Sequence, residues 1–511
     1  MSLFKSAFTV GSFTLFSRIL GYVRDILIAS SLGASVIADA FFVAFRLPNF
    51  FRQLSAEGAF NAAFVPLFSQ KLEEKGKDKA RNFAEQAMSF MFFALLALTI
   101  LMEIFMPAVM HVLAPGFVDN PEKFGLSVEF ARILFPYLIF ISLVSLFSGI
   151  LNSIGKFAVP ASAPIILNLC MITGLLFFTQ YFSTSAHTLS WAVAIAGLLQ
   201  FLWLFIIAHK NGFKITLRRP KINDNIKTLL KRMVPGIIGG GVTQINLWVN
   251  TVIATTMASA VSYLYYADRL VQFPLAIIGT AMGTALLPNL SRQIKKQDID
   301  GAINTQNKAV EITMLFTIPA ATALFVIADN LIGVMFQRGA FTSIETLATA
   351  KALQAYSVGL PAFVLIKIFA PVFFANSDTK TPVKIAAICL VANVTISLSL
   401  IGHIGYIGLA VATSSAAWLN SILLLILLKK RELYVQKVGI LVKIVKILIC
   451  ASFMGGVLYF AEIELGKHFS DSFWDKITSL ILLIFSGLVS YFLLISIIGG
   501  YRKADVSRLV R

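Results

Sequence analysis

Long apolar segments recur along the whole chain, and each approaches the roughly 20 residues that a helix needs to cross about 30 Å of hydrocarbon. We predict fourteen of them, at 8–29, 37–69, 86–110, 130–151, 160–180, 188–208, 234–256, 264–290, 310–335, 352–375, 384–401, 406–428, 440–460 and 477–499. The composition agrees, because 58% of the 511 residues are apolar and only 13% are charged. Such a chain exposes too little polar surface for a soluble protein. The pattern predicts an all-α membrane protein with about 14 transmembrane helices.

The basic residues are distributed unevenly between the connections. Of the 43 Lys and Arg residues, we count 30 in alternate connections and four in the others. Cytoplasmic connections of membrane proteins accumulate Lys and Arg, so the pattern places both termini in the cytoplasm and requires an even number of spans. The net charge of +18 is then mainly a signal of topology. We expect no nucleic-acid partner and a secondary attraction to membrane lipids.

Cysteine and histidine give no sign of a metal centre. Cys170, Cys389 and Cys450 are isolated, and the five histidines are scattered over loops and span ends. Neither set has the spacing of a metal site or a disulfide framework. We expect no cofactor, no metal and no enzymatic activity.

The chain contains an internal repeat. Three pairs of similar stretches occur in the same order at offsets of 222 to 225 residues: 42–50 with 265–273, 63–69 with 285–291, and 152–156 with 376–380. One repeat therefore contains six helices, and an even number keeps both copies in the same orientation. We predict a first lobe at 1–210, a cytoplasmic linker at 211–233, a second lobe at 234–430, and two further helices with a cytoplasmic tail at 431–511. Two lobes that rock about a central site are typical of alternating-access transporters.

Several charged residues lie inside the predicted spans. The basic ones are Arg18, Arg24, Arg46, Arg52, Arg269 and Lys367, and the acids near them are Asp25, Asp39, Glu57 and Asp268. An Arg or Lys at the centre of a span opposes insertion by about 2.5 to 3.5 kcal/mol. Helical spacing puts Arg18 and Asp25 on one face, and Asp39, Arg46 and Glu57 on one stripe, so part of the charge can be neutralised internally. The remaining cationic surplus predicts a polar cavity that binds an anion.

Arginine dominates this basic set, and its planar guanidinium suits bidentate binding of phosphate or carboxylate. The alternative is that the arginines hold helices together through ion pairs and carbonyl contacts. Lys367 and Glu103 are isolated, and the sequence leaves open whether each has a cavity role or a local structural one.

Seven stretches carry a family resemblance. They are 17–25, 38–49, 51–52, 56–60, 63–66, 265–270 and 283–288. They resemble the MurJ (MviN) family of lipid II flippases, within the multidrug/oligosaccharidyl-lipid/polysaccharide exporter superfamily. The resemblance extends over the whole chain, including the number of spans.

The resemblance implies a flippase that carries undecaprenyl-pyrophosphate-linked disaccharide-pentapeptide from the cytoplasmic to the periplasmic leaflet of the bacterial inner membrane for peptidoglycan synthesis. Arg18, Arg24, Arg52 and Arg269 match the family's required cavity arginines, and Asp39 matches its acid near the cavity opening. At Arg46 the resemblance implies a position that is basic in the family, as Arg or Lys. Spans 13 and 14 are placed to line the family's groove for the lipid tail. The family's sodium site is not carried over, because we find no matching set of acids around Asp378.

The expected substrate-binding set is therefore Arg18, Arg24, Arg46, Arg52 and Arg269, with Asp25, Asp39, Glu57 and Asp268 as cavity or gating acids. We expect lipid II and membrane lipids as partners, and a monomer. The alternatives are a polysaccharide-lipid flippase or a multidrug exporter of the same superfamily, and, in another class, a membrane enzyme acting on lipid phosphates. Such an enzyme would need convergent acids or histidines at the membrane face and a sizeable aqueous domain. Membrane potential and ion coupling both remain open as the driving force.

Overall fold

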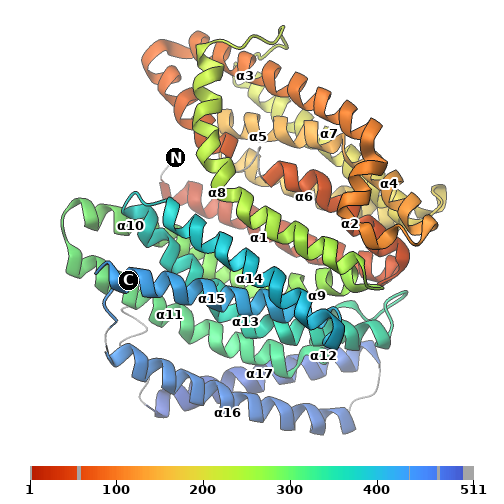
Figure 1. Ribbon diagram of the computed structural model, residues 1–511, viewed down its shortest axis with the longest axis vertical. Coiled ribbons are helices and arrows are strands. Elements are labelled where there is room, and N and C mark those ends of the chain that lie inside the picture. Colours follow the sequence, from red (N-terminus) through yellow and green to blue (C-terminus); the bar gives the residue numbers. More distant parts are fainter. Residues whose placement is uncertain (1–2, 54–58, 437, 469–471, 499–511) are drawn as a thin grey trace. The chain divides into compact units, whose positions relative to one another are not determined.

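The computed structural model describes the chain except for residues 1–2, 54–58, 437, 469–471 and 499–511, and the described residues form helices and no strand (Figure 1). Contacts between residues divide the chain into two compact units. Unit 1 comprises residues 1–262 with 338–341, and unit 2 comprises 263–337 with 342–511. The short segment 338–341 belongs to unit 1 because the Ala340 amide donates to the Ser30 carbonyl at 2.8 Å.

Unit 1 holds the helices of the first half of the chain. They are α1 (Leu3–Leu32), α2 (Val36–Phe51), α3 (Asn61–Leu113), α4 (Pro121–Leu134), α5 (Tyr137–Ser153), α6 (Ala158–Thr173), α7 (Ser185–Lys210) and α8 (Asp224–Thr255), with the short elements η2 (Pro115–Phe117), η3 (Gly174–Phe178) and η4 (Thr179–Tyr181). The first residues of α9 (Ala260–Pro274) also belong to this unit.

Unit 2 holds most of α9 and the helices that follow it. They are η5 (Leu275–Thr280), α10 (Ala281–Lys295), α11 (Ile299–Val326), α12 (Ala328–Phe336), α13 (Ser343–Ala375), α14 (Lys380–Ile404), α15 (Ile407–Lys430), α16 (Val438–His468) and α17 (Phe473–Ile497). Within this unit α13 packs against α11 and α15, and α16 packs against α11 and α17.

The fold class is the predicted one, and the described residues of the fourteen apolar segments lie mainly in helical elements. Within the described part of the chain, eleven helices are long and apolar enough to cross a membrane, or up to twelve when the bent pair in α8 is one span. The segments at 8–29 and 37–69 do not pass that test on their own. Arg18 and Arg24 lower the hydropathy of α1, and α2 is only 16 residues long.

Gly76 separates two predicted spans inside the continuous element α3. Its φ of 77° and ψ of 175° break the helical path there. A positive φ costs a residue with a Cβ but not glycine. The chain can therefore leave the span that ends near residue 69 and enter the span that begins near residue 86.

The repeat is visible in the backbone. Stretches 42–50 and 265–273 lie in α2 and α9, and 152–156 and 376–380 form the turns after α5 and α13. π-helical turns follow both charged helices, at residues 52–53 and 59–60 in the first copy and at Leu275–Thr280 in the second. The lobe boundaries inferred from the repeat stay a prediction. The two units are defined by contacts between residues, so they do not test boundaries that were defined by the repeat.

Candidate substrate-binding residues

Arg24 lies in a polar cluster between α1 and α6. Its Nε and Nη2 donate to Oδ1 of Asp25 at 3.0 and 2.7 Å, and its Nη1 donates to Oδ1 of Asn168 at 2.9 Å. The Asn168 amide nitrogen in turn donates to the Ser17 carbonyl at 2.9 Å. Asp25 and Asn168 are both buried, so the guanidinium of Arg24 is held in a fixed orientation. Hydrogen bonds on several sides of a planar group restrict its rotation.

Arg18 has a different environment on the same helix. It is exposed, and within the part of the chain that the structure describes it makes no hydrogen bond or ion pair. Helical spacing suggested Asp25 as its partner, but that carboxylate is bound by the adjacent Arg24. Arg18 therefore keeps its charge on the surface of α1.

Arg46 and Arg52 project from the second half of α2 and just beyond it, and both are half-buried. The Arg46 Nη1 donates to the hydroxyl of Thr251 on α8, and the Arg52 Nε donates to Oδ1 of Asn49 at 3.1 Å. Glu57, the third acid expected in this lobe, lies outside the described residues. Unit 1 thus places four arginines on α1, α2 and the turn that follows α2.

Among the described acids of the expected set, Asp39 is the most deeply buried. It is fully buried, and its Oδ2 accepts from Nζ of Lys123 at 2.7 Å. Its Oδ1 accepts from the backbone amide and the hydroxyl of Ser262, at 3.0 and 2.6 Å. The Lys123 ammonium also lies 4.1 Å from the centroid of the Phe117 ring. The sequence suggested neutralisation of Asp39 along its own helix, but its cationic partner comes from α4.

Unit 2 contributes Asp268 and Arg269 on α9. The guanidinium of Arg269 lies over the Tyr265 ring, 4.5 Å from its centroid. Asp268 is half-buried and accepts a hydrogen bond of 3.2 Å from Gln272 on the same helix. A guanidinium stacked on an aromatic face keeps its in-plane N–H groups at the edge, where an anion can approach.

Lys367, on α13, is exposed and makes no hydrogen bond or ion pair with any described residue. Its stem passes close to Gly279 and Gly283, where an added Cβ would lie 3.7 Å from Lys367 Cγ and 2.9 Å from the Lys367 carbonyl oxygen. The two glycines allow α13 to approach this segment closely. Glu103 lies beside Arg132, whose Nε donates to the Glu103 carbonyl at 3.3 Å, which favours a local structural role.

Asp378 is bound by a cation of the chain itself. Its carboxylate accepts from the hydroxyl and amide of Thr381, at 2.6 and 3.0 Å, and forms an ion pair of 2.5 Å with Arg431. These hydrogen bonds, led by the Thr381 hydroxyl, hold the pKa of Asp378 well below its usual range. The geometry fits a cap on the first turn of α14.

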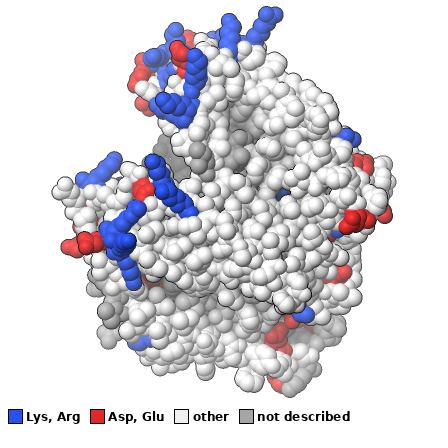
Figure 2. All heavy atoms as spheres, viewed as in Figure 1, with Lys and Arg blue, Asp and Glu red and all other residues white. Residues whose placement is uncertain are grey.

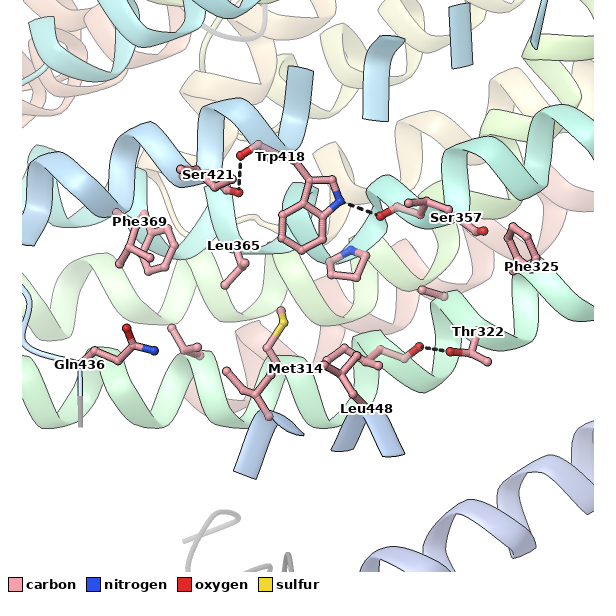
Figure 3. Close-up of a pocket in the computed structure, with 18 of the residues that line it drawn as sticks. Met314, Thr322, Phe325, Ser357, Leu365, Phe369, Trp418, Ser421, Gln436 and Leu448 are labelled. Atoms are coloured by element: carbon pink, nitrogen blue, oxygen red, sulfur yellow. Dashed lines mark hydrogen bonds between the residues drawn. The ribbon is translucent and has the colours of Figure 1, made fainter. Parts of the chain in front are cut away.

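An apolar cavity of about 460 Å³ opens in unit 2 between α11, α13, α15 and α16 (Figure 3). Figure 3 shows Met314, Leu365, Trp418 and Leu448 pointing toward this space. The Trp418 indole N–H donates to the Val358 carbonyl at 2.9 Å, which satisfies the polar edge of the ring. Tyr434 and Gln436 line the same cavity. The space suits a flexible hydrocarbon chain, because nearly all of its wall is apolar.

Sequence reasoning missed four residues of these clusters: Asn168, Thr251, Lys123 and Ser262. Asn168 and Thr251 are polar residues inside apolar runs, which is a usable signal. Lys123 was counted among the four basic residues on the sparse side of the membrane, so its position against the charge rule was also a signal. Nothing in the sequence identifies Ser262.

The arrangement of helices matches solved membrane transporters. One is described as an inward-facing conformation of a multidrug resistance MATE family transporter of the MOP superfamily, with a TM-score of 0.71 and 14% identity over 83% of this chain and 98% of that chain. This chain therefore shares its fold with that membrane transporter.

More specific likenesses identify the family. A family model described as lipid II flippase MurJ matches residues 28–483. A probable lipid II flippase MurJ of Rhizobium tropici is 42% identical, with coverage of 99% of this chain and 96% of that protein. The lipid II flippase MurJ of Burkholderia cenocepacia is 37% identical, with 91% of each covered. A solved structure described as lipid II flippase MurJ in an inward closed conformation has a TM-score of 0.81 and 28% identity, covering 98% of this chain and 99% of that chain. The chain belongs to the lipid II flippase MurJ family.

Proposed function

We propose that this protein is a lipid II flippase, which moves the undecaprenyl-pyrophosphate-linked peptidoglycan precursor from the cytoplasmic to the periplasmic leaflet. The observation that carries the proposal is a set of arginines on helices that otherwise suit hydrocarbon, in a chain of this family. Lipid II presents a pyrophosphate, and guanidinium groups bind phosphate oxygens in pairs. Charged residues inside spans mark the path of a polar substrate more often than they serve packing.

In this proposal the arginines of the substrate-binding set contact the pyrophosphate. Arg24 is oriented by Asp25 and Asn168, and those contacts occupy only some of its five N–H donors. Arg18, Arg46 and Arg52 add charge in unit 1, and Arg269 adds charge in unit 2. Binding at depth in a low dielectric strengthens each of these attractions.

The buried Asp39 network acts as a gate in the same proposal. The ion pair with Lys123 and the two bonds from Ser262 tie α2 to α4 and to the start of α9. A buried ion pair is stable only while its partners stay together. In this proposal Ser262 separates from Asp39 when the substrate is exposed to the other leaflet. Loss of the negative charge of Asp39 weakens the network that holds them together.

The prenyl tail occupies the apolar cavity of unit 2 while the headgroup crosses. α16, which corresponds to span 13, contributes Ile444 and Leu448 to the wall, and this supports a role for span 13 in holding the tail. The cavity of about 460 Å³ accommodates part of a long prenyl chain, and the rest stays in the bilayer.

The protein works as a monomer in the bacterial inner membrane, with both termini in the cytoplasm. The asymmetry of Lys and Arg supports this orientation. On the face drawn in Figure 2, the basic side chains of unit 1 gather where α3 breaks at Gly76 and α8 begins. Lys71, Lys75, Lys77, Lys227 and Lys231 belong to those segments.

The test is rescue of cells depleted of their own MurJ-family protein, with transport measured as arrival of lipid II in the outer leaflet. Wild type restores growth and transport. Arg24→Ala inserts into the membrane at wild-type level but restores neither, and Arg24→Lys restores part of the activity because it keeps the charge. Normal transport by Arg24→Ala, or a wild type that moves no lipid II, would overturn the proposal.

A further inference from the structure

A polar cavity of about 600 Å³ lies at the end of unit 2 where α12 meets the starts of α13 and α17. Its wall includes Asp329 and Gln337 from α12, Ser343 and Thr346 from α13, and Lys476 from α17. Gly333 also lines the cavity, and it packs closely against the Gln337 side chain, since an added Cβ there would lie 3.3 Å from Oε1 of Gln337. None of these residues belongs to the arginine clusters described above.

The cavity wall carries both signs of charge on different elements. Asp329 supplies a carboxylate from α12, and next to it Asn330 donates to Oε1 of Glu462 at 2.5 Å. Lys476 supplies an ammonium from α17. The positive charge of Lys351 on α13 attracts the Asp329 carboxylate without direct contact. The carboxylate side and the Lys476 side suit a ligand that itself carries a cation and an anion.

An apolar groove of about 170 Å³ lies in the same unit, between α11, α16 and α17. Its wall includes Ile327, Ala323, Leu458, Leu483 and Gly487. Gly487 is a close fit rather than an open position, because an added Cβ would lie 3.1 Å from Cδ2 of Leu458. The groove therefore accepts a slender, flexible apolar group.

Residues that are close in the sequence line the two spaces. Ile327 lines the groove, and Asp329, two residues later, lines the polar cavity. On α17, Leu483 lies about two turns beyond Lys476 and on nearly the same face, since each turn takes 3.6 residues. A single amphiphile could reach both spaces with its head and one chain.

We propose that this part of unit 2 binds a zwitterionic glycerophospholipid whose headgroup carries a primary amine. Its phosphate contacts Lys476, its ammonium contacts Asp329, and an acyl chain lies in the groove between α11, α16 and α17. A lipid with only a negative head would place its charge near Asp329. A quaternary ammonium has no N–H to donate to that carboxylate. The proposal is independent of lipid II transport, since neither space contains an arginine of the substrate-binding set.

The test is native mass spectrometry of the purified full-length protein with phosphatidylethanolamine, phosphatidylcholine and phosphatidylglycerol of identical chains. Wild type binds phosphatidylethanolamine about two- to fivefold more tightly than the other two, the range that one exposed ion pair supports. Asp329→Asn removes the preference over phosphatidylglycerol, and Lys476→Gln weakens binding of all three. Ala323→Leu narrows the groove and weakens binding of all three without changing their order.

Asp300→Asn and Val391→Phe serve as matched controls, because both residues are exposed and lie outside the two spaces. Both controls keep the wild-type binding profile, and thermal unfolding confirms that every variant is folded. Equal binding of the three lipids by wild type, or a wild-type profile in Asp329→Asn, overturns the proposal. Displacement of phosphatidylethanolamine by undecaprenyl pyrophosphate at equal concentration also overturns it, because the site would then belong to the transport path.

Discussion

Arg46 in α2 and Arg269 in α9 occupy the same position of the internal repeat, but their surroundings differ. Arg46 donates to Thr251 on another helix, whereas Arg269 lies over the ring of Tyr265, one turn away on its own helix. The backbone around them is alike, since π-helical turns follow both helices. Duplication has thus kept the position of the cation and the bend of the helix while the groups that orient the cation diverged.

The acids of the two copies differ in the same direction. Asp39 is fully buried and bound to Lys123 and Ser262, whereas Asp268 is half-buried and bound to Gln272 on its own helix. Ser262 stands 223 residues after Asp39, within the offset of the repeat, so matched positions of the two copies bond to each other. Asp39 is thus held by groups from two other helices, whereas Asp268 is held by a residue on its own helix. Substitutions in the Asp39 network should therefore affect folding, whereas substitution of Arg269 should affect substrate binding.

The largest effect on stability is expected for Lys123→Met. It leaves the Asp39 carboxylate buried without its cation, which costs about 3 to 5 kcal/mol of the free energy of unfolding. The measurement is the thermal midpoint of the purified protein, with Asp268→Asn as the control in the other copy, where a change of less than about 0.5 kcal/mol is expected.

The double variant Asp39→Asn with Lys123→Met sharpens this contrast. It removes both charges and should recover most of the lost stability, because a neutral pair needs no counter-charge. Wild-type stability in Lys123→Met alone would show that the buried pair does not distinguish the two copies.

Of the two arginines at matching positions of the repeat, Arg269 is expected to show the larger effect on transport when it is replaced by Ala. Removal of a guanidinium that binds pyrophosphate at depth costs about 2 to 5 kcal/mol of binding, or at least about 30-fold in transport. Arg46→Ala should lose less, because part of that guanidinium is engaged by Thr251. Transport assays of both variants, with membrane insertion verified, decide the order, and equal losses would contradict it.

The helices and the cationic spans were predictable from sequence because each depends on local composition. Apolar runs located the spans, and Arg18, Arg24, Arg46, Arg52 and Arg269 were visible as charges inside them. Helical spacing along one chain indicated which charges share a face, but it did not identify the ion pairs. Asp25 binds Arg24 and not Arg18, and the cation of Asp39 is Lys123.

The partners could not be predicted because they come from other helices. Asn168 lies 144 residues from Arg24, and Thr251 lies 205 residues from Arg46. Periodicity describes which residues share a face of one helix, but it carries no information on which faces meet. The tight turns also depend on backbone angles such as the positive φ of Gly76. The sequence contains 32 glycines and does not indicate which of them adopt such an angle.

A smaller effect is expected at the turn after α13, where the second copy has Asp378 and the first copy has Ile154 at the matching position. Asp378→Ala removes the cap on α14 and the ion pair with Arg431, which together contribute about 1 to 2 kcal/mol. The pKa of Asp378 is lowered in the folded state. Its contribution is therefore present above the unfolded value near 4 and is lost as the pH falls through the lowered pKa.

The measurement is the thermal midpoint of wild type and Asp378→Ala as a function of pH. The two curves should be separated at pH 7 and converge at low pH. Ile154→Ala in the first copy is the comparison, and its effect should not depend on pH because no carboxylate is lost. Parallel curves for Asp378→Ala would rule out the capping carboxylate as the cause.

The smallest effect is expected at Lys367. The same offset that separates Asn152 from Asn376 makes the buried Leu143 its counterpart in the first copy. Lys367 is exposed, and its stem lies against Gly279 and Gly283, so Lys367→Gln should leave the stability within about 0.5 kcal/mol of wild type. A cation that only attracts the pyrophosphate from a distance contributes about 1 kcal/mol, so transport should fall about fivefold and the loss should shrink at high salt. Lys367→Arg should keep wild-type transport because it preserves the charge. A salt-independent loss in Lys367→Gln would instead indicate a packing role for the stem, and the cationic contribution of the second copy would then rest on Arg269.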